Sequence, residues 1–159
     1  MKDDDLIILV RHALAQDSHR AGDGARGLTE EGRRKFRKQA QRLARKLSIR
    51  LIVSSPLVRA VQTAELLAEA CGVDTVEIHE ALSPGPHATL RILKLIDTLP
   101  RGTAVVGHNP SLEEVAGRLL HQSPLLYDFK KGVAYAVRRE SGGGQLALYL
   151  APGRKPVRP

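Results

Sequence analysis

The chain of 159 residues has the length of one compact domain, and its 42% hydrophobic residues exclude an intrinsically disordered protein. No apolar run approaches the roughly 20 residues that a membrane span requires, and the single cysteine, Cys71, excludes an internal disulfide. The net charge of +8 attracts polyanions, but an aromatic content of 3% without tryptophan argues against a protein that stacks single-stranded nucleic acid. We therefore expect a cytoplasmic protein that binds neither a membrane nor nucleic acid.

Short apolar runs alternate with amphipathic segments over most of the chain. In chain order they predict a strand at Leu6–Val10, a helix capped near Thr29 and ending near Leu47, a strand at Leu51–Val53, a helix at Val58–Ala70, a strand at Val73–Ile78, a helix at His87–Leu99, a strand at Ala104–Val106 and a helix at Ser111–Leu120. Ser55 and Pro56 are expected to begin the second helix, as its cap and its first residue. Four strand–helix repeats predict a three-layer α/β fold (helices, sheet, helices) with a mainly parallel sheet.

The C-terminal part departs from this alternation. Gly132–Arg138 and Gln145–Leu150 alternate polar and apolar residues, and the segment 141–144 between them is rich in glycine. This pattern predicts a hairpin that adds an antiparallel edge to the sheet. We expect a single domain over residues 1–152, followed by a loose basic tail at 153–159, where proline is frequent.

Charged or imidazole side chains follow every predicted parallel strand. In chain order these residues are Arg11 and His12, then Arg59 in the first turn of the second helix, then His79 and Glu80, then His108 and Asn109. Ligands of open α/β sheets bind beyond the carboxyl ends of the strands, and guanidinium and imidazole groups suit a phosphoryl dianion. Each residue alone reads as ordinary surface, but together they predict a phosphate pocket made by Arg11, His12, Arg59 and His108.

Four segments jointly resemble the histidine phosphatase superfamily, which has the phosphoglycerate-mutase-like fold: Leu9–Ala13, Ser54–Ala64, His79–Leu82 and Gly107–Pro110. The resemblance implies that His12 is a nucleophile that takes up the phosphoryl group, and that Arg11, Arg59 and His108 stabilise its charge. The other ring nitrogen of His12 should donate to a backbone carbonyl, which fixes the tautomer. Most members have glycine where this chain has Ala13, and a positive φ at that position would strain the alanine.

Three further residues have two interpretations each. Glu80 matches the position from which related enzymes protonate the leaving group, or it is a solvated loop carboxylate. Asn109 contributes a phosphate donor or caps the next helix, and Arg26 borders the phosphate or is an ordinary loop arginine. The sequence shows no cysteine–histidine cluster and no paired carboxylates, so we expect neither a metal nor a cofactor.

The substrate class is suggested by what lies between Glu80 and His108. Only one helix is predicted there, whereas sugar-phosphate mutases and acid phosphatases of the family insert a helical subdomain. We expect an open pocket that admits a phosphorylated side chain of another protein, because tight small-molecule sites bury most of their ligand. The chain, including its segment 26–32, is similar to the small phosphohistidine phosphatases of bacterial phosphorelays, and a metal-independent phosphatase of that kind is our leading prediction.

Two alternatives stay open. One is a phosphatase for a small phosphorylated metabolite or nucleotide, and the other is a non-catalytic module that binds phosphorylated or acidic partners. The many basic residues of the first helix are either a solvated face or a partner surface, and the sequence leaves the oligomeric state undetermined.

Overall fold

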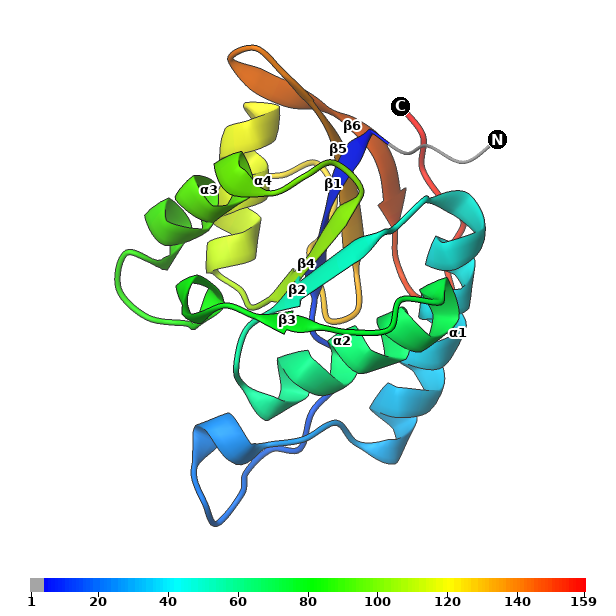
Figure 1. The fold of residues 1–159 in the computed structure, drawn as a ribbon, viewed down its shortest axis with the longest axis vertical. Coiled ribbons are helices and arrows are strands. Elements are labelled where there is room, and N and C mark those ends of the chain that lie inside the picture. The colour runs from blue at the N-terminus through cyan, green and yellow to red at the C-terminus, as the bar shows by residue number, and fades with distance from the viewer. Residues whose placement is uncertain (1–4) are drawn as a thin grey trace.

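The computed structural model describes residues 5–159, and a six-stranded sheet in the order β3-β2-β4-β1-β5-β6 forms its centre (Figure 1). The strands are β1 (Leu6–Arg11), β2 (Leu51–Ser54), β3 (Glu77–Ile78), β4 (Thr103–Gly107), β5 (Ala134–Glu140) and β6 (Gly143–Leu150). The helices are α1 (Glu30–Lys46), α2 (Val58–Cys71), α3 (Ala88–Thr98) and α4 (Ser111–Leu120), with short 3-10 turns η1 (Asp23–Ala25) and η2 (Glu80–Leu82). None of the helices in this range is long and apolar enough to cross a membrane.

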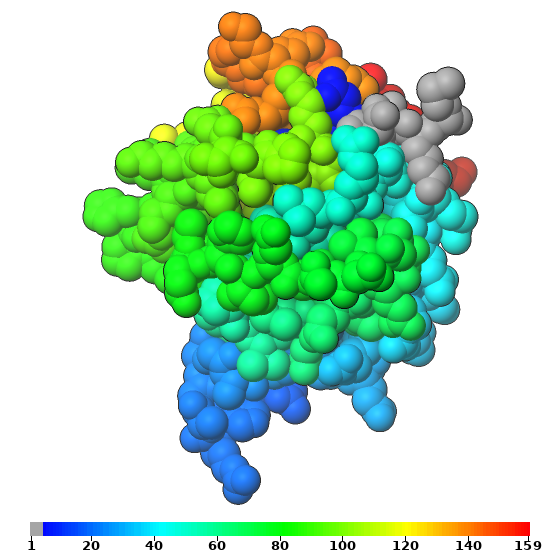
Figure 2. All heavy atoms as spheres, viewed as in Figure 1, coloured from blue at the N-terminus to red at the C-terminus, as the bar shows by residue number. Residues whose placement is uncertain are grey.

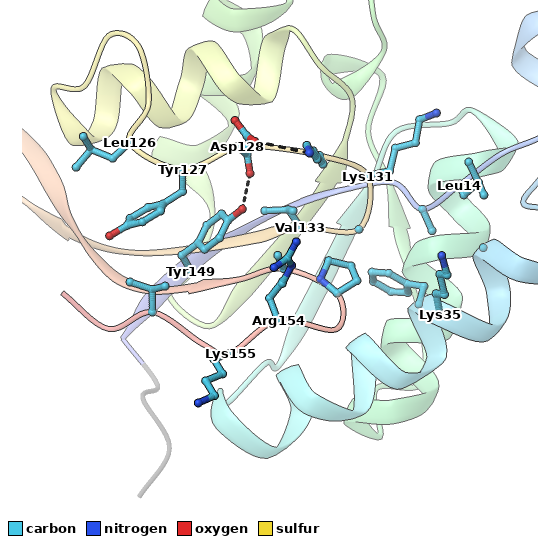
Figure 3. A pocket seen from close by; sticks show the side chains of 18 residues that line it. Leu14, Lys35, Leu126, Tyr127, Asp128, Lys131, Val133, Tyr149, Arg154 and Lys155 are labelled. Atoms are coloured by element: carbon cyan, nitrogen blue, oxygen red, sulfur yellow. Dashed lines mark hydrogen bonds and ion pairs between the residues drawn. The ribbon is translucent and has the colours of Figure 1, made fainter.

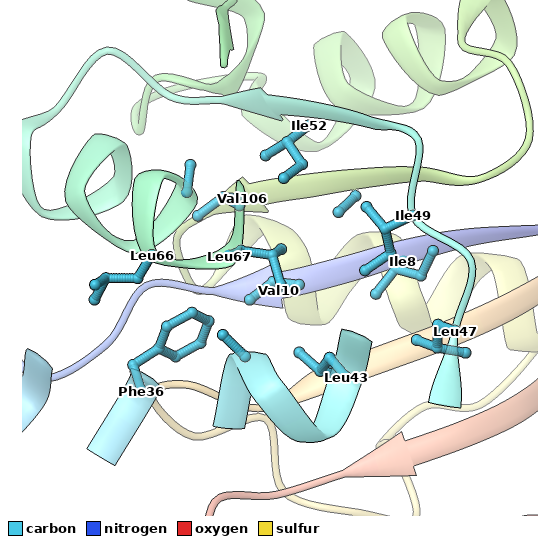
Figure 4. Close-up of a cluster of buried hydrophobic side chains, with 14 of the residues drawn as sticks. Ile8, Val10, Phe36, Leu43, Leu47, Ile49, Ile52, Leu66, Leu67 and Val106 are labelled. Atoms are coloured by element: carbon cyan, nitrogen blue, oxygen red, sulfur yellow. The ribbon is translucent and has the colours of Figure 1, made fainter. Parts of the chain in front are cut away.

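The strand pairing confirms the predicted α/β class. β3, β2, β4 and β1 pair in parallel, whereas β5 pairs antiparallel with both β1 and β6. β1 is therefore paired on both sides and covered on both faces, which explains why its sequence is apolar throughout. Ile8 and Val10 pack toward α1 and α2, as Figure 4 shows, while Ile7 and Leu9 pack toward α3 and α4.

The order in which the chain visits the strands decides where a ligand can bind. From β1 through β2 to β3 the chain moves toward one edge of the sheet, and then it returns to β4 and β5. Because parallel crossovers are right-handed, α1 and α2 cover one face and α3 and α4 the other (Figure 1). The connections after β1 and β4 thus leave toward opposite faces, which opens a crevice between the carboxyl ends of these adjacent strands.

Several element boundaries differ from the prediction. Thr29 caps α1 as expected, since its hydroxyl accepts from the amide of Gly32 at 2.9 Å. α2, however, begins at Val58 behind Leu57, so the expected start at Ser55 and Pro56 was wrong. β3 has only two residues instead of six, because it lies at the sheet edge and pairs with β2 alone.

The C-terminal segment is not the loose tail that its proline content predicted. The backbone of Val157 pairs with Tyr149 of β6 through two hydrogen bonds of 2.9 Å. Arg42 of α1 donates to the carbonyl of Ala151 at 3.1 Å and to that of Arg154. Proline breaks regular structure, but these contacts fix the segment against β6 and α1.

Candidate active site

Four side chains that follow three neighbouring strands converge in the crevice between β1 and β4. His12 directly follows β1, His108 directly follows β4, and their rings lie 5.2 Å apart between centroids. Arg59 comes from the first turn of α2, which follows β2, and Arg11 is the last residue of β1. His12 and Arg59 are each 6% exposed and His108 is 3% exposed, so the cluster is buried.

The ring of His12 is held in one orientation by its own neighbour. Nδ1 lies 2.8 Å from the carbonyl oxygen of Ala13, and since a carbonyl only accepts, Nδ1 must donate. This is the hydrogen bond that the sequence led us to expect, and it leaves Nε2 unprotonated in the neutral ring. Burial, and then the charges of Arg59 and Arg11, lower the pKa of His12 to about 4, so the ring is neutral at pH 7.

His108 is held by a residue that sequence reasoning assigned to another role. Its Nε2 lies 2.7 Å from the hydroxyl of Ser55, which also accepts from the amide of Leu57 at 3.2 Å. Burial, followed by the proximity of His12, lowers the pKa of His108 to about 3. Ser55 was expected to cap α2; instead it orients an imidazole, because the helix begins two residues later than predicted.

Arg59 is held by Asp23, a residue that the sequence did not single out. The Arg59 guanidinium donates from Nη1 to the Asp23 carbonyl at 2.9 Å and from Nη2 to its carboxylate at 3.1 Å. Arg26 donates to the other carboxylate oxygen at 2.9 Å, and the hydrogen bonds from Arg26 and Arg59 lower the pKa of Asp23. Arg26 therefore borders the cluster through Asp23.

Arg11 and Asn109 converge on one backbone carbonyl. Arg11 Nη1 donates to the Phe129 carbonyl at 3.2 Å, and Asn109 Nδ2 donates to the same oxygen at 2.8 Å. Of the two interpretations of Asn109, the helix cap was wrong, because Pro110 is the residue at the N-cap of α4. Burial lowers the pKa of Arg11.

Ala13 is accommodated without the strain that its departure from glycine suggested. Its φ is not among the positive values of the described residues, and its amide donates to Thr63 Oγ1 at 3.0 Å. Thr63 in turn donates to the carbonyl of Arg59 at 2.8 Å. A buried threonine of α2 thus joins the His12 turn to the helix that carries Arg59.

Glu80 lies outside this cluster of contacts. It is exposed in η2, and its carboxylate accepts from Ser83 of the same turn at 3.2 Å. Within residues 5–159 it forms neither a hydrogen bond nor an ion pair with Arg11, His12, Arg59 or His108.

Two segments of the chain bear on the expectation of an open pocket. Between β3 and β4 only η2 and α3 are present, so the helical insertion is absent from this stretch, as predicted. The β1–α1 connection reaches the cluster, because its η1 turn places Asp23 on Arg59. Figure 2 shows this segment as the blue projection at one end of the molecule.

Unpartnered polar atoms mark the cluster as an anion site. Three buried nitrogen atoms there have no hydrogen-bond partner: Arg11 Nε, Arg59 Nε and His108 Nδ1. Arg11 Nε and Arg59 Nε can only donate, and buried donors normally have partners, so these two atoms indicate a missing acceptor. Two guanidinium groups and an imidazole suit an oxyanion. No group of three metal-ligating side chains occurs in the part of the chain that the structure describes.

Comparisons with known proteins agree with this geometry. The model of the histidine phosphatase superfamily (branch 1) matches residues 7–83. An uncharacterised protein of Picosynechococcus sp. is 39% identical over 115 residues, which are 69% of this chain and 70% of that protein. The protein histidine phosphatase SixA, solved with tungstate, has a TM-score of 0.78 at 24% identity over 92% of this chain and 97% of its own. SixA from Nakamurella multipartitia has a TM-score of 0.75 at 25% identity, with coverages of 94% and 96%.

Proposed function

The chain belongs to the histidine phosphatase superfamily and is a phosphatase, and from this premise we propose that it removes the phosphoryl group from phosphohistidine on a phosphorelay protein. The intermediate in this proposal is a phosphoryl group on Nε2 of His12. The observation that carries it is the 2.8 Å contact between His12 Nδ1 and the Ala13 carbonyl. It directs the lone pair of Nε2 away from the backbone, in a cluster where the donors Arg11 Nε and Arg59 Nε have no partner.

The chemistry proceeds in two displacements. Nε2 attacks phosphorus, a P–N bond to His12 forms, and the bond from phosphorus to the substrate nitrogen breaks. The substrate imidazole, protonated on its distal nitrogen, leaves as a neutral ring. Water then attacks phosphorus, the bond from phosphorus to Nε2 breaks with its electron pair returning to Nε2, and both protons of the water leave with the product as dihydrogen phosphate. Arg11, Arg59 and His108 stabilise the equatorial oxygens in both steps.

The contacts of Glu80 support phosphohistidine over an ordinary phosphate ester. An alkoxide leaving group requires a positioned acid, whereas an imidazole already protonated on its distal nitrogen does not. Because Glu80 bonds with Ser83 and not with the pocket, it does not supply that acid in this arrangement. SixA, whose fold the chain shares, is itself a protein histidine phosphatase. We place the reaction in the cytoplasm, the compartment expected for a chain with a free cysteine.

Removing the nucleophile tests the covalent mechanism. His12→Ala should abolish hydrolysis of p-nitrophenyl phosphate, while the wild-type protein should yield an acid-labile phosphoenzyme when it is mixed with a radiolabelled substrate. Retention of most activity in His12→Ala, with circular dichroism unchanged, would remove the covalent mechanism. The absence of any hydrolysis or label in the wild type would favour the non-catalytic binding module.

A substrate panel tests the second part of the proposal. A phosphorylated histidine phosphotransfer domain is compared with phosphate monoesters of sugars, nucleotides and serine at equal concentration. We expect the phosphotransfer domain to give the highest kcat/KM. A clear preference for one metabolite would replace the protein substrate by a small molecule and leave the role of His12 intact.

A further inference from the structure

A long groove runs between α1, the segment 126–133 and the C-terminal residues 151–157, beside the active site. It consists of two hollows of about 680 Å³ and 810 Å³ that share four lining residues: Lys35, Pro152, Arg154 and Lys155. We call this continuous surface the α1 groove. Figure 3 shows its first hollow, where the Arg154 side chain points toward Val133 and Tyr149 and the Lys155 side chain extends away from them.

Positive charge dominates the lining of the α1 groove. Its basic residues are Arg34, Lys35, Lys38, Arg42, Arg45, Lys46, Lys130, Lys131, Arg154 and Lys155, against a single acidic residue, Asp128. Two of these cations have a carboxylate partner in the described chain: Lys35 pairs with Glu31 at 2.9 Å and Lys130 with Asp128 at 3.7 Å. The α1 groove therefore has several cations that no carboxylate of residues 5–159 neutralises, and these cations can bind an anionic ligand.

The arrangement of these charges costs stability in the free protein. Arg34, Lys38, Arg42 and Lys46 follow one another at four-residue intervals, which places them in one row on α1. Like charges at this spacing repel each other by a few tenths of a kcal/mol per pair. An acidic partner would turn this repulsion into attraction.

The floor of the groove indicates what kind of anion fits it. Phe36, Val133 and Tyr149 lie on the floor of the first hollow, and Leu126 at its margin is 73% exposed. An exposed leucine beside an apolar floor suits a ligand with apolar side chains as well as acidic ones. A protein segment has both, while a nucleic-acid backbone has no apolar side chains. The positive charge and the apolar floor of the α1 groove together favour an acidic, amphipathic protein segment as its ligand.

The walls of the groove are held in place before any ligand arrives. Gln39 of α1 is buried and donates to the carbonyls of Gly132 and Leu150, each at 2.9 Å. Arg42 binds the carbonyls of Ala151 and Arg154, as described above. A ligand therefore meets a preformed surface and does not have to order it.

The groove begins at the catalytic turn. Ala13 and Leu14, which follow His12, line the first hollow, and Lys131 lies close enough to lower the pKa of His12. The amide of Gly132 donates to the carbonyls of Arg11 and His12 at 3.0 and 3.2 Å. The first hollow therefore begins at the residue that directly follows His12 in the chain.

We propose that the α1 groove docks an acidic segment of the phosphorylated protein substrate, beside the residue that carries the phosphoryl group. This inference rests on the proposed function, since it names the part of the protein substrate that the enzyme recognises. α1 has 17 residues. At 1.5 Å per residue it is about 25 Å long, a distance that about eight extended residues cover.

Two synthetic phosphohistidine peptides test the proposal. They are identical except that the residues flanking the phosphohistidine are glutamate and leucine in one and serine and leucine in the other. The wild-type protein should hydrolyse the acidic peptide with about tenfold higher kcat/KM at low salt, because several screened charge pairs add up. The preference should disappear near 1 M salt, where the Debye length is about 3 Å.

A pair of matched variants locates the effect. Lys38→Glu/Arg45→Glu reverses two exposed groove charges that hold no wall in place, and Lys94→Glu/Arg118→Glu makes the same change in net charge on α3 and α4. The first variant should lose the preference for the acidic peptide, and the second should keep most of it. Both should hydrolyse p-nitrophenyl phosphate at the wild-type rate, because neither touches the pocket.

Fluorescence anisotropy measures binding of the same peptides without phosphate. This measurement tests the docking surface independently of the proposed function. If the protein fails to hydrolyse phosphohistidine yet binds the acidic peptide through Lys38 and Arg45, the substrate proposal fails and the docking surface stands. Equal binding of the acidic and serine peptides, or equal losses in the two variants, overturns the docking surface. Tighter binding of single-stranded RNA than of the acidic peptide, lost in Lys38→Glu/Arg45→Glu, replaces the protein segment by nucleic acid.

Discussion

The proposed phosphate pocket and the α1 groove both contain several cations, but the cations of the two regions differ in burial. In the pocket, Arg59 is almost fully buried and held by Asp23, and burial keeps His12 and His108 neutral. In the groove, cations such as Lys38 and Arg45 are exposed to solvent. Charge interactions are strong where water is excluded and weak where it screens them. The pocket can therefore bind one dianion with defined geometry, whereas the groove can only add many small, salt-dependent contributions.

The largest expected effect comes from changing a pocket cation without changing its charge. Arg59→Lys keeps the charge but loses the planar fork that holds Asp23 and faces the anion site. We expect kcat/KM for p-nitrophenyl phosphate to fall by about 100-fold or more, as when one transition-state donor is removed. The control is Arg45→Lys in the groove, which should keep nearly full activity. Similar losses in both variants would contradict the distinction between the two regions.

The buried histidines should make stability depend on pH. An unfolded histidine takes up a proton near pH 6.5, while folded His108, with its pKa lowered to about 3, does not. The unfolded state then binds more protons, so stability falls as pH drops below 6.5. Between pH 7 and pH 5 we expect a loss of about 2 kcal/mol that His108→Gln removes. Urea denaturation of both proteins at the two pH values measures this change in the free energy of unfolding. An equal loss in the wild type and in His108→Gln would contradict a neutral His108 ring in the folded protein.

Gln39→Leu tests whether the groove wall is built independently of the pocket. The change leaves the carbonyls of Gly132 and Leu150 without the amide that binds them. We expect a loss of about 1 to 2 kcal/mol in the free energy of unfolding. At temperatures where the variant is folded, hydrolysis of p-nitrophenyl phosphate should change little. Loss of p-nitrophenyl phosphate hydrolysis in the folded variant would show that the pocket depends on the groove wall.

The smallest effect is expected at the contact between Asp23 and Arg59. Asp23→Asn keeps the backbone carbonyl that accepts from Arg59 and removes a negative charge beside the anion site. Inhibition by tungstate, a tetrahedral oxyanion, should therefore become about two- to threefold tighter, as for one partly exposed charge. Weaker inhibition would show that Asp23 acts chiefly by orienting the guanidinium, and Asp128→Asn in the groove is the matched control.

Local sequence patterns were sufficient for the elements with strong periodicity. The apolar run that became β1, the capped helix α1 and the hairpin of β5 and β6 all lie where the pattern placed them, within a few residues. The pattern was misleading at β3 and at the segment 153–159. β3 is short because an edge strand has one partner. The C-terminal segment is held by Tyr149 of β6 and by Arg42, which lies 112 positions from Arg154.

The sequence by itself predicted that Arg11, His12, Arg59 and His108 lie together, because parallel strands bring whatever follows them to one edge of the sheet, and the structure brings these side chains together. Only the tertiary structure decided their surroundings. Asp23 on Arg59 and Ser55 on His108 are contacts between segments far apart in the chain, and no local periodicity encodes them. The same holds for the α1 groove: the sequence contains the basic row of α1, but only packing against residues 151–157 makes it a wall beside the catalytic turn.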